Sequence, residues 1–118
     1  MSELRAAAAL LGREPQPLRL QVPGNVAITT LTCWQSADGY HLSLQVFTSV
    51  ILQADYVDGK WVAAVRADGW ASQATKNRLN AVLAGLGIKH RIAYKDKLLW
   101  LQRDGLDYCL ATTPFITV

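Results

Sequence analysis

Two histidines and two cysteines are the side chains of this 118-residue chain best suited to nucleophilic or metal chemistry: His41, His90, Cys33 and Cys109. A Ser–His or Cys–His pair can supply a nucleophile and its base, but no nucleophile-elbow or cysteine-rich motif surrounds these residues. Their spacing also lacks the short ligand pairs of structural zinc sites. We therefore expect no catalytic residue, no metal and no cofactor. A small hydrolase using His41 or His90 stays as an alternative, which a nucleophile or carboxylate beside either ring in a pocket would favour.

The cysteines and the apolar runs indicate where the protein works. Cys33 and Cys109 each lie in an apolar, strand-like stretch, as expected of buried free thiols in a reducing compartment. An even number of cysteines leaves a disulfide open. No apolar run reaches the roughly 18 residues of a membrane span, and the short run over residues 6–11 is interpreted as a helix rather than a signal peptide. The expected location is the cytoplasm, without a membrane partner.

The positive charge of the chain is unevenly distributed. The formal net charge is +3, yet residues 60–105 carry nine basic and three acidic side chains, whereas the rest carries three basic and six acidic ones. A hydrophobic fraction of 51% and a charged fraction of 18% exclude general disorder, so this charge belongs to a folded surface. The second half of the chain is where an anionic partner is expected.

One basic stretch has strand spacing. Lys89, Arg91 and Lys95 are all odd-numbered, so a strand through them projects them from one sheet face, with Lys97 in the turn beside them. Asp96 is the only acid close in sequence that could offset them. Partner binding is one interpretation. Protection of a sheet edge, or plain solubility, is the other.

A main helix is predicted over residues 72–86, with Ser72 as its N-cap and Gly85 and Gly87 at its end. Its apolar stripe consists of Thr75, Leu79, Val82, Leu83 and Leu86. The other side carries Gln73, Asn77 and Asn80, with Lys76 beside them and Arg78 toward the opposite edge. Amides and cations together can contact bases and phosphates, and an ordinary solvated helix face is the alternative.

The remaining pattern predicts a single α+β domain over residues 1–118, with a mostly antiparallel sheet of six to eight strands. A short N-terminal helix over residues 3–11 is expected to end at Gly12 in the left-handed conformation. The predicted strands cover residues 18–22, 26–34, 40–46, 50–57, 60–66, 89–94, 98–103 and 106–112, with hairpin turns at Asp38-Gly39, Asp58-Gly59 and Asp104-Gly105. The run Leu98–Leu101 is apolar on both faces, which suggests a strand covered on both sides, and Tyr94 and Trp100 are expected to face the core.

The segment from Val50 to Leu83, and within it Trp70-Ala71-Ser72-Gln73-Ala74-Thr75-Lys76-Asn77-Arg78-Leu79-Asn80, resembles a small family of uncharacterised phage, prophage and mobile-element proteins. In that family a strand pair leads into a Ser-x-x-Thr helix start, a basic or histidine position and Leu-Asn. This chain departs from the pattern at Ala74-Thr75 and Asn77-Arg78, where the family often has Thr-Thr and His. The resemblance implies a mobile-element origin and transfers no active site.

These features together predict a small non-enzymatic accessory protein, of phage or prophage type, that binds a host protein or nucleoprotein complex. An inhibitor of a host defence complex fits that description, and the host-cell cytoplasm is then its location. The expected partner-binding surface consists of Lys89, Arg91, Lys95, Lys97, Lys76, Arg78 and Asn77. Direct binding of DNA or RNA by the same surface is the alternative. The oligomeric state stays open, a dimer included.

Overall fold

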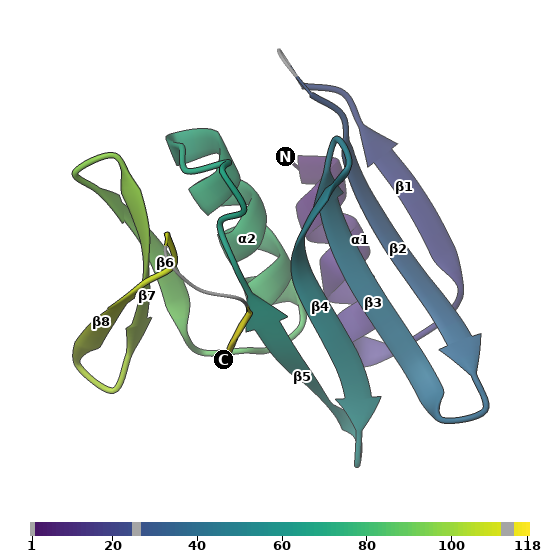
Figure 1. The fold of residues 1–118 in the computed structure, drawn as a ribbon. Helices are drawn as coiled ribbons and strands as arrows, with labels where there is room; N and C mark the ends of the chain where they lie inside the picture. The colour runs from purple at the N-terminus through teal and green to yellow at the C-terminus, as the bar shows by residue number, and fades with distance from the viewer. Residues whose placement is uncertain (1, 25–26, 112–114) are drawn as a thin grey trace.

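A computed structural model describes residues 2–24, 27–111 and 115–118. Within them the chain is an α+β fold, as predicted, with two helices and nine strands (Figure 1). The elements are α1 (Ser2–Arg13), β1 (Leu18–Val22), β2 (Thr29–Ser36), β3 (Gly39–Val46), β4 (Ser49–Val57), β5 (Lys60–Val65), α2 (Gln73–Gly85), β6 (Arg91–Lys95), β7 (Leu98–Arg103), β8 (Leu106–Cys109) and β9 (Ile116–Thr117). Two predicted strand ends, Val26 and Thr112, lie outside the described residues.

The strands form two antiparallel sheets rather than one. The main sheet has the order β1-β2-β3-β4-β5-β9, and a smaller one has the order β6-β7-β8. Hairpin turns connect neighbouring strands where the sequence predicts them: Asp58 and Gly59 have φ values of 51° and 81°, and Asp104 and Gly105 have 54° and 79°. Two consecutive positive φ angles match the right-handed twist of the strands they join. The ninth strand, β9, pairs with β5 through Ile116 and Thr117.

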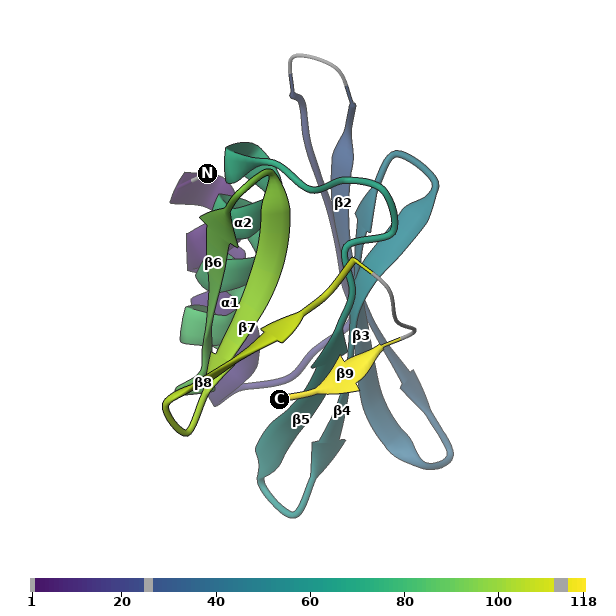
Figure 2. The same ribbon diagram turned by 60° about the vertical axis from the view of Figure 1, so that its left-hand side comes forward.

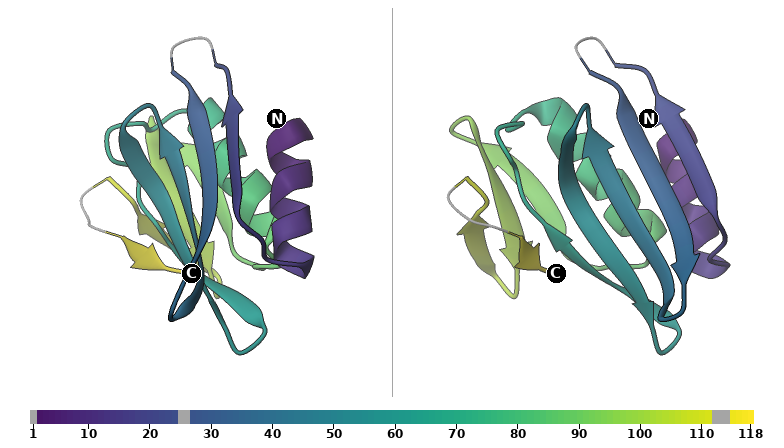
Figure 3. Two further views of the ribbon diagram at one scale, coloured as in Figure 1. Left: turned by 90° about the vertical axis from the view of Figure 1, so that its right-hand side faces the viewer. Right: turned by 45° about the vertical axis from the view of Figure 1, so that its right-hand side comes forward.

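The two helices lie side by side on one face of the main sheet, and the small sheet stands beside α2 (Figures 1 and 2). Both helices run in the same direction, so their C-terminal ends meet. The opposite face of the main sheet, called here the outer face, carries no helix of the described residues (Figure 3). Trp34 and Asp55 on this face are exposed.

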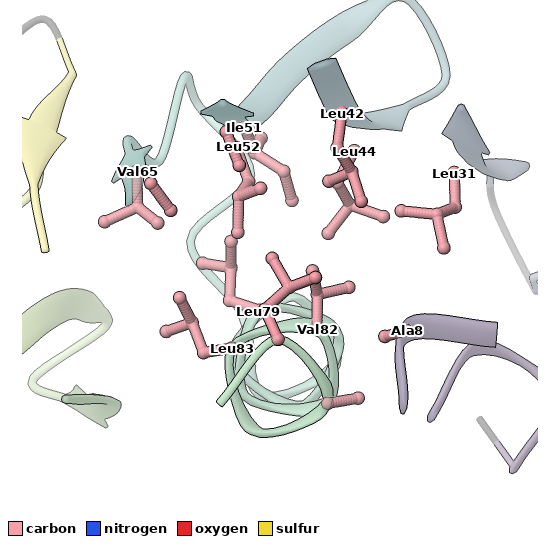
Figure 4. Packing of buried hydrophobic residues seen from close by; sticks show 14 of the residues in the cluster. Ala8, Leu31, Leu42, Leu44, Ile51, Leu52, Val65, Leu79, Val82 and Leu83 are labelled. Carbon is pink, nitrogen blue, oxygen red and sulfur yellow. The ribbon is translucent and has the colours of Figure 1, made fainter. Parts of the chain in front are cut away.

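The core lies between the helices and the main sheet (Figure 4). The predicted stripe of α2 is confirmed, since Thr75, Leu79, Val82 and Leu83 are fully buried. Alternation along the strands supplies the other half of the core, as Leu31, Leu42, Leu44, Leu52 and Val65, all at 0–1% exposure. Ser72 caps α2 as predicted, and its Oγ accepts a hydrogen bond from the backbone N–H of Thr75 at 3.1 Å.

Gly12 does not end α1, as its residue type suggested, but lies within the helix. A Cβ at this position would lie 2.0 Å from the carbonyl oxygen of Gly85, and a Cβ at Gly85 would lie 2.6 Å from the backbone of Ala8. Both glycines thus let the two helix backbones touch. Gly87, with φ +81°, provides the left-handed residue that ends α2.

The small sheet is covered on one side only, contrary to the expectation from its apolar run. Leu99 and Leu101 are fully buried, and Tyr94 packs against the core. Trp100 lies on the other face, because it pairs with Ala93 and alternates with Leu99 and Leu101. Its Nε1–H donates to the carbonyl of Lys95 at 3.1 Å.

Both cysteines are free thiols, as predicted, but Cys109 at the end of β8 is half-buried rather than buried. Cys33 is buried in β2, and this burial raises the pKa of its thiol, with a backbone hydrogen bond from Gln16 opposing the shift. A thiol held in its neutral form is a poor nucleophile. Cys33 is therefore a core residue.

Candidate functional site

The predicted basic surface lies on the small sheet. Arg91 and Lys95 share one face of β6, four residues apart, and Lys97 occupies the β6–β7 turn with φ +61°. Lys89 precedes the strand and is exposed. The strand register thus places the two strand cations on the same side, as the spacing predicted.

Lys95 is not a free cation. Its Nζ lies 2.5 Å from Oδ2 of Asp107, which β8 brings to the same face, and 5.6 Å from the centre of the Trp100 ring. Asp96 is the only acid close to this cluster in sequence, and strand pairing adds Asp107 as an acidic neighbour of Lys95 in space. Asp107 is 12 residues away in sequence, and only the pairing of β6, β7 and β8 places it here.

Lys76 and Arg78, the two cations of α2, do not both lie next to the basic residues of the small sheet. Arg78 points to the β1–β2 side of α2, where its guanidinium lies 3.0 Å from the position of a Cβ on Gly24. Its partial burial lowers the pKa of the guanidinium. Lys76 lies one helical turn before Asn80, and i, i+4 spacing puts it on the side of α2 that contacts β6. Lys76 and Arg78 therefore lie on different sides of α2.

Asn80, one of two mid-helix asparagines, holds the small sheet to α2. Its Nδ2 donates to the carbonyl of Ile92 at 2.9 Å, and its Oδ1 accepts from the N–H of Ile92 at 2.8 Å. The Asn80 amide thus makes the two hydrogen bonds that the backbone of a neighbouring strand would make at the edge of β6.

Asn80→Ala is expected to lower the free energy of unfolding by about 2 kcal/mol, because two partly buried hydrogen bonds are lost and each contributes about 1 kcal/mol. Urea unfolding followed by circular dichroism measures this change. Asn77→Ala is the matched control, since Asn77 is exposed on the same helix, and a change within about 0.5 kcal/mol is expected there. Equal effects would show that the Asn80 contact contributes nothing.

A groove runs between α1 and α2 on the side away from the sheet. Arg5 and Arg91 stand at its walls, and it has a volume of about 750 Å³. Its other lining residues are Ala6, Ala9, Asn77, Asn80, Ala81 and Ala84, so no carboxylate lines the described groove. Arg91 is also held in place, because it donates to the carbonyls of Ile88 and His90.

Arg5 was not among the predicted binding residues, although the spacing of nearby alanines indicates the groove beside it. Alanines at 6 and 9 and at 81 and 84 are each spaced three apart, which places small side chains on one helix face. When two such helix faces meet, the helices pack closely and the alanines form the shallow floor of the groove. Recognising that floor would have drawn attention to Arg5 beside it.

A second constellation lies on the outer face of the main sheet. The Ser36 hydroxyl lies 2.7 Å from Nε2 of His41, and Nδ1 of His41 lies 2.7 Å from Oδ1 of Asp55. Strand register positions them, since His41 is directly opposite both Trp34 on β2 and Asp55 on β4. His41 thus meets the geometric condition set for the hydrolase alternative. The ring of His90 has no hydrogen-bonded partner among the described residues.

A shallow hollow of about 390 Å³ adjoins His41 and Asp55. The side chains around it are Trp34, Gln53, Val62, Ala64 and Thr117. The ring of Trp34, at 44% exposure, lies 5.6 Å from that of His41. Ser36 lies just beyond the hollow, at the end of β2. Ser36 and Asp55 were not singled out from the sequence, because their contact with His41 depends on the pairing of three strands.

No family model, curated protein or solved structure matches the chain. The resemblance of residues 50–83 to phage and mobile-element proteins therefore stays a prediction. Neither described helix is long and apolar enough to cross a membrane. In the described part of the chain, no three histidine, cysteine, aspartate or glutamate side chains are grouped as ligands for a metal ion.

Proposed function

We propose that the protein binds an acidic segment of a partner protein in the groove between α1 and α2. One observation carries the proposal: Arg5 and Arg91 come from different elements, face the same groove, and share it with no carboxylate among the described lining residues. Lys89, just before Arg91, and Lys97 at the far turn add exposed positive charge on the neighbouring sheet. Opposite charge on a partner would be steered to this side of the molecule.

The floor of the groove favours a polypeptide over a phosphate backbone. It consists of the methyl groups of four alanines, Ala6, Ala9, Ala81 and Ala84. Such a floor can pack against aliphatic side chains, while the arginine fork binds carboxylates in two parallel hydrogen bonds. The partner is then a host protein or nucleoprotein complex, an assignment that rests on the resemblance to phage proteins. Direct binding of DNA or RNA is the second candidate, and the same cations support it.

The triple variant Arg5→Glu/Lys89→Glu/Lys97→Glu is expected to weaken binding of a fluorescent peptide of glutamate, alanine and leucine about 10-fold or more. Each exposed ion pair contributes roughly 0.2–1 kcal/mol, and reversal adds repulsion. Arg91 is left unchanged because its guanidinium also donates hydrogen bonds to two backbone carbonyls. Fluorescence anisotropy measures the affinity, and Arg19→Glu, an exposed arginine of β1 on the outer face, is the control.

Unchanged peptide affinity of the triple variant would refute this groove as the binding surface. Titrations with short DNA and RNA duplexes decide the second candidate, because log affinity then falls linearly with log salt, at a slope set by the number of phosphates contacted. Affinity capture from a host lysate, with nuclease treatment and the triple variant as a control, would then identify the natural partner.

A further inference from the structure

Ser36, His41 and Asp55 have the contacts of a nucleophile, its base and the group that orients the base. Nδ1 of His41 faces a carboxylate, so this nitrogen carries the ring proton of the neutral imidazole. Nε2 is then an acceptor, and the Ser36 hydroxyl donates to it at 2.7 Å. These distances fall in the range of activated serine nucleophiles.

Two further features fit a nucleophilic role for Ser36. The backbone N–H of Asp38 donates to its Oγ at 3.2 Å, and this contact stabilises negative charge on that oxygen. Ser36 is also exposed at the end of β2, so a substrate carbonyl can approach it. The His41 side chain, at 23% exposure, is shielded by the Trp34 ring and so held in one orientation.

We propose that Ser36, His41 and Asp55 form a second, hydrolytic site that cleaves small uncharged carboxylic esters. The substrate class follows from the neighbouring hollow, whose apolar walls are Trp34, Val62 and Ala64 and whose polar groups are the amide of Gln53 and the hydroxyl of Thr117. No lysine or arginine lines the hollow among the described residues, so an anionic substrate has no counter-charge there. The site lies on the outer face, away from the groove, and is independent of the proposed partner binding.

The reaction uses water as its only co-reactant. Oγ of Ser36 attacks the ester carbonyl carbon while its proton passes to Nε2 of His41. The carbon–oxygen bond to the alcohol then breaks, and His41 returns the proton to the departing alcohol. Water, deprotonated by His41, attacks the acyl-serine, and release of the carboxylic acid restores the Ser36 hydroxyl. Asp55 positions the ring through its contact with Nδ1.

A fluorophosphonate probe tests the nucleophile directly, because it reacts covalently with activated serines. Labelling of the native protein at Ser36, located by peptide mass spectrometry, is the expected result. Ser36→Ala abolishes the labelling, whereas Ser43→Ala, which removes a hydroxyl from the same sheet face, retains it. Loss of labelling in denatured protein confirms that the fold activates the serine.

Hydrolysis of p-nitrophenyl acetate separates catalysis from a purely structural role. His41→Gln is expected to lower kcat by about 100-fold or more. Asp55→Asn lowers kcat with KM unchanged, because it acts through the tautomer of His41. Trp34→Ala lowers kcat and raises KM, because its ring both orients His41 and lines the hollow. Thermal melting of each variant verifies folding.

Two results would overturn the proposal: native protein that leaves Ser36 unlabelled, or a Ser36→Ala variant with the native rate of hydrolysis. In either case the three residues only clamp the β2–β3 hairpin to β4. Binding of the acidic peptide is measured on the same variants. Because it uses the opposite side of the molecule, its loss or retention reports separately on the proposed function.

Discussion

Leu83→Ala is expected to lower the free energy of unfolding by about 2–5 kcal/mol, the range for removing a fully buried leucine from a packed core. Leu83 has 0% exposure, and it points from α2 toward the strands of the main sheet (Figure 4). Neighbours on both layers are themselves fully buried, so they can close the resulting cavity only in part. Chemical denaturation with urea measures the loss.

Leu106→Ala is the matched control for that experiment, since this leucine of β8 is 59% exposed. A change within about 0.5 kcal/mol is expected there. Equal effects of the two substitutions would show that a different face of α2 packs on the sheet. The positions given for Lys76, Asn77 and Arg78 would then be wrong as well.

Gly85→Ala is expected to destabilise the protein by about 1–3 kcal/mol through overpacking. Helix propensity alone predicts the opposite sign, because alanine is favoured over glycine by about 1 kcal/mol inside a helix. The added methyl group would lie 2.6 Å from the backbone of Ala8, and backbone atoms cannot move aside as a flexible side chain can. The sign of the change therefore tests the helix contact.

Thermal melting compares Gly85→Ala with Gly12→Ala, which would bring a methyl group within 2.0 Å of the Gly85 carbonyl oxygen. Both variants should melt at lower temperature than the native protein. Ala74→Gly, at an exposed position of α2, measures the effect of helix propensity on stability without a helix–helix contact. A stabilised Gly85→Ala would mean that the two helices do not touch.

Features encoded by near neighbours were predictable from the sequence. The α2 stripe follows from residues three and four apart, and the Ser72 cap and the Asp-Gly turns follow from local hydrogen bonding and positive φ angles. The α+β class follows from the same signals. Because each depends on only a few consecutive residues, the composition of a short segment decides it.

Features that depend on which strands and helices become neighbours could not be predicted in this way. Asp107 neutralises Lys95, and Asp55 meets His41, only because particular strands pair in a particular register. Gly12 looks like a helix terminator until a second helix is known to cross at that position. Trp100 likewise faces outward because only one side of the small sheet meets the core.

The shared direction of α1 and α2 has an electrostatic consequence. Parallel helices place their partial negative ends together, where the last carbonyl groups of each lack helical partners. Arg13 in the last turn of α1, and Lys89 and Arg91 just after α2, bring positive charge to that end. Some of the basic residues therefore compensate the dipoles of the protein's own helices. An external anion encounters a smaller field than the count of lysines and arginines implies.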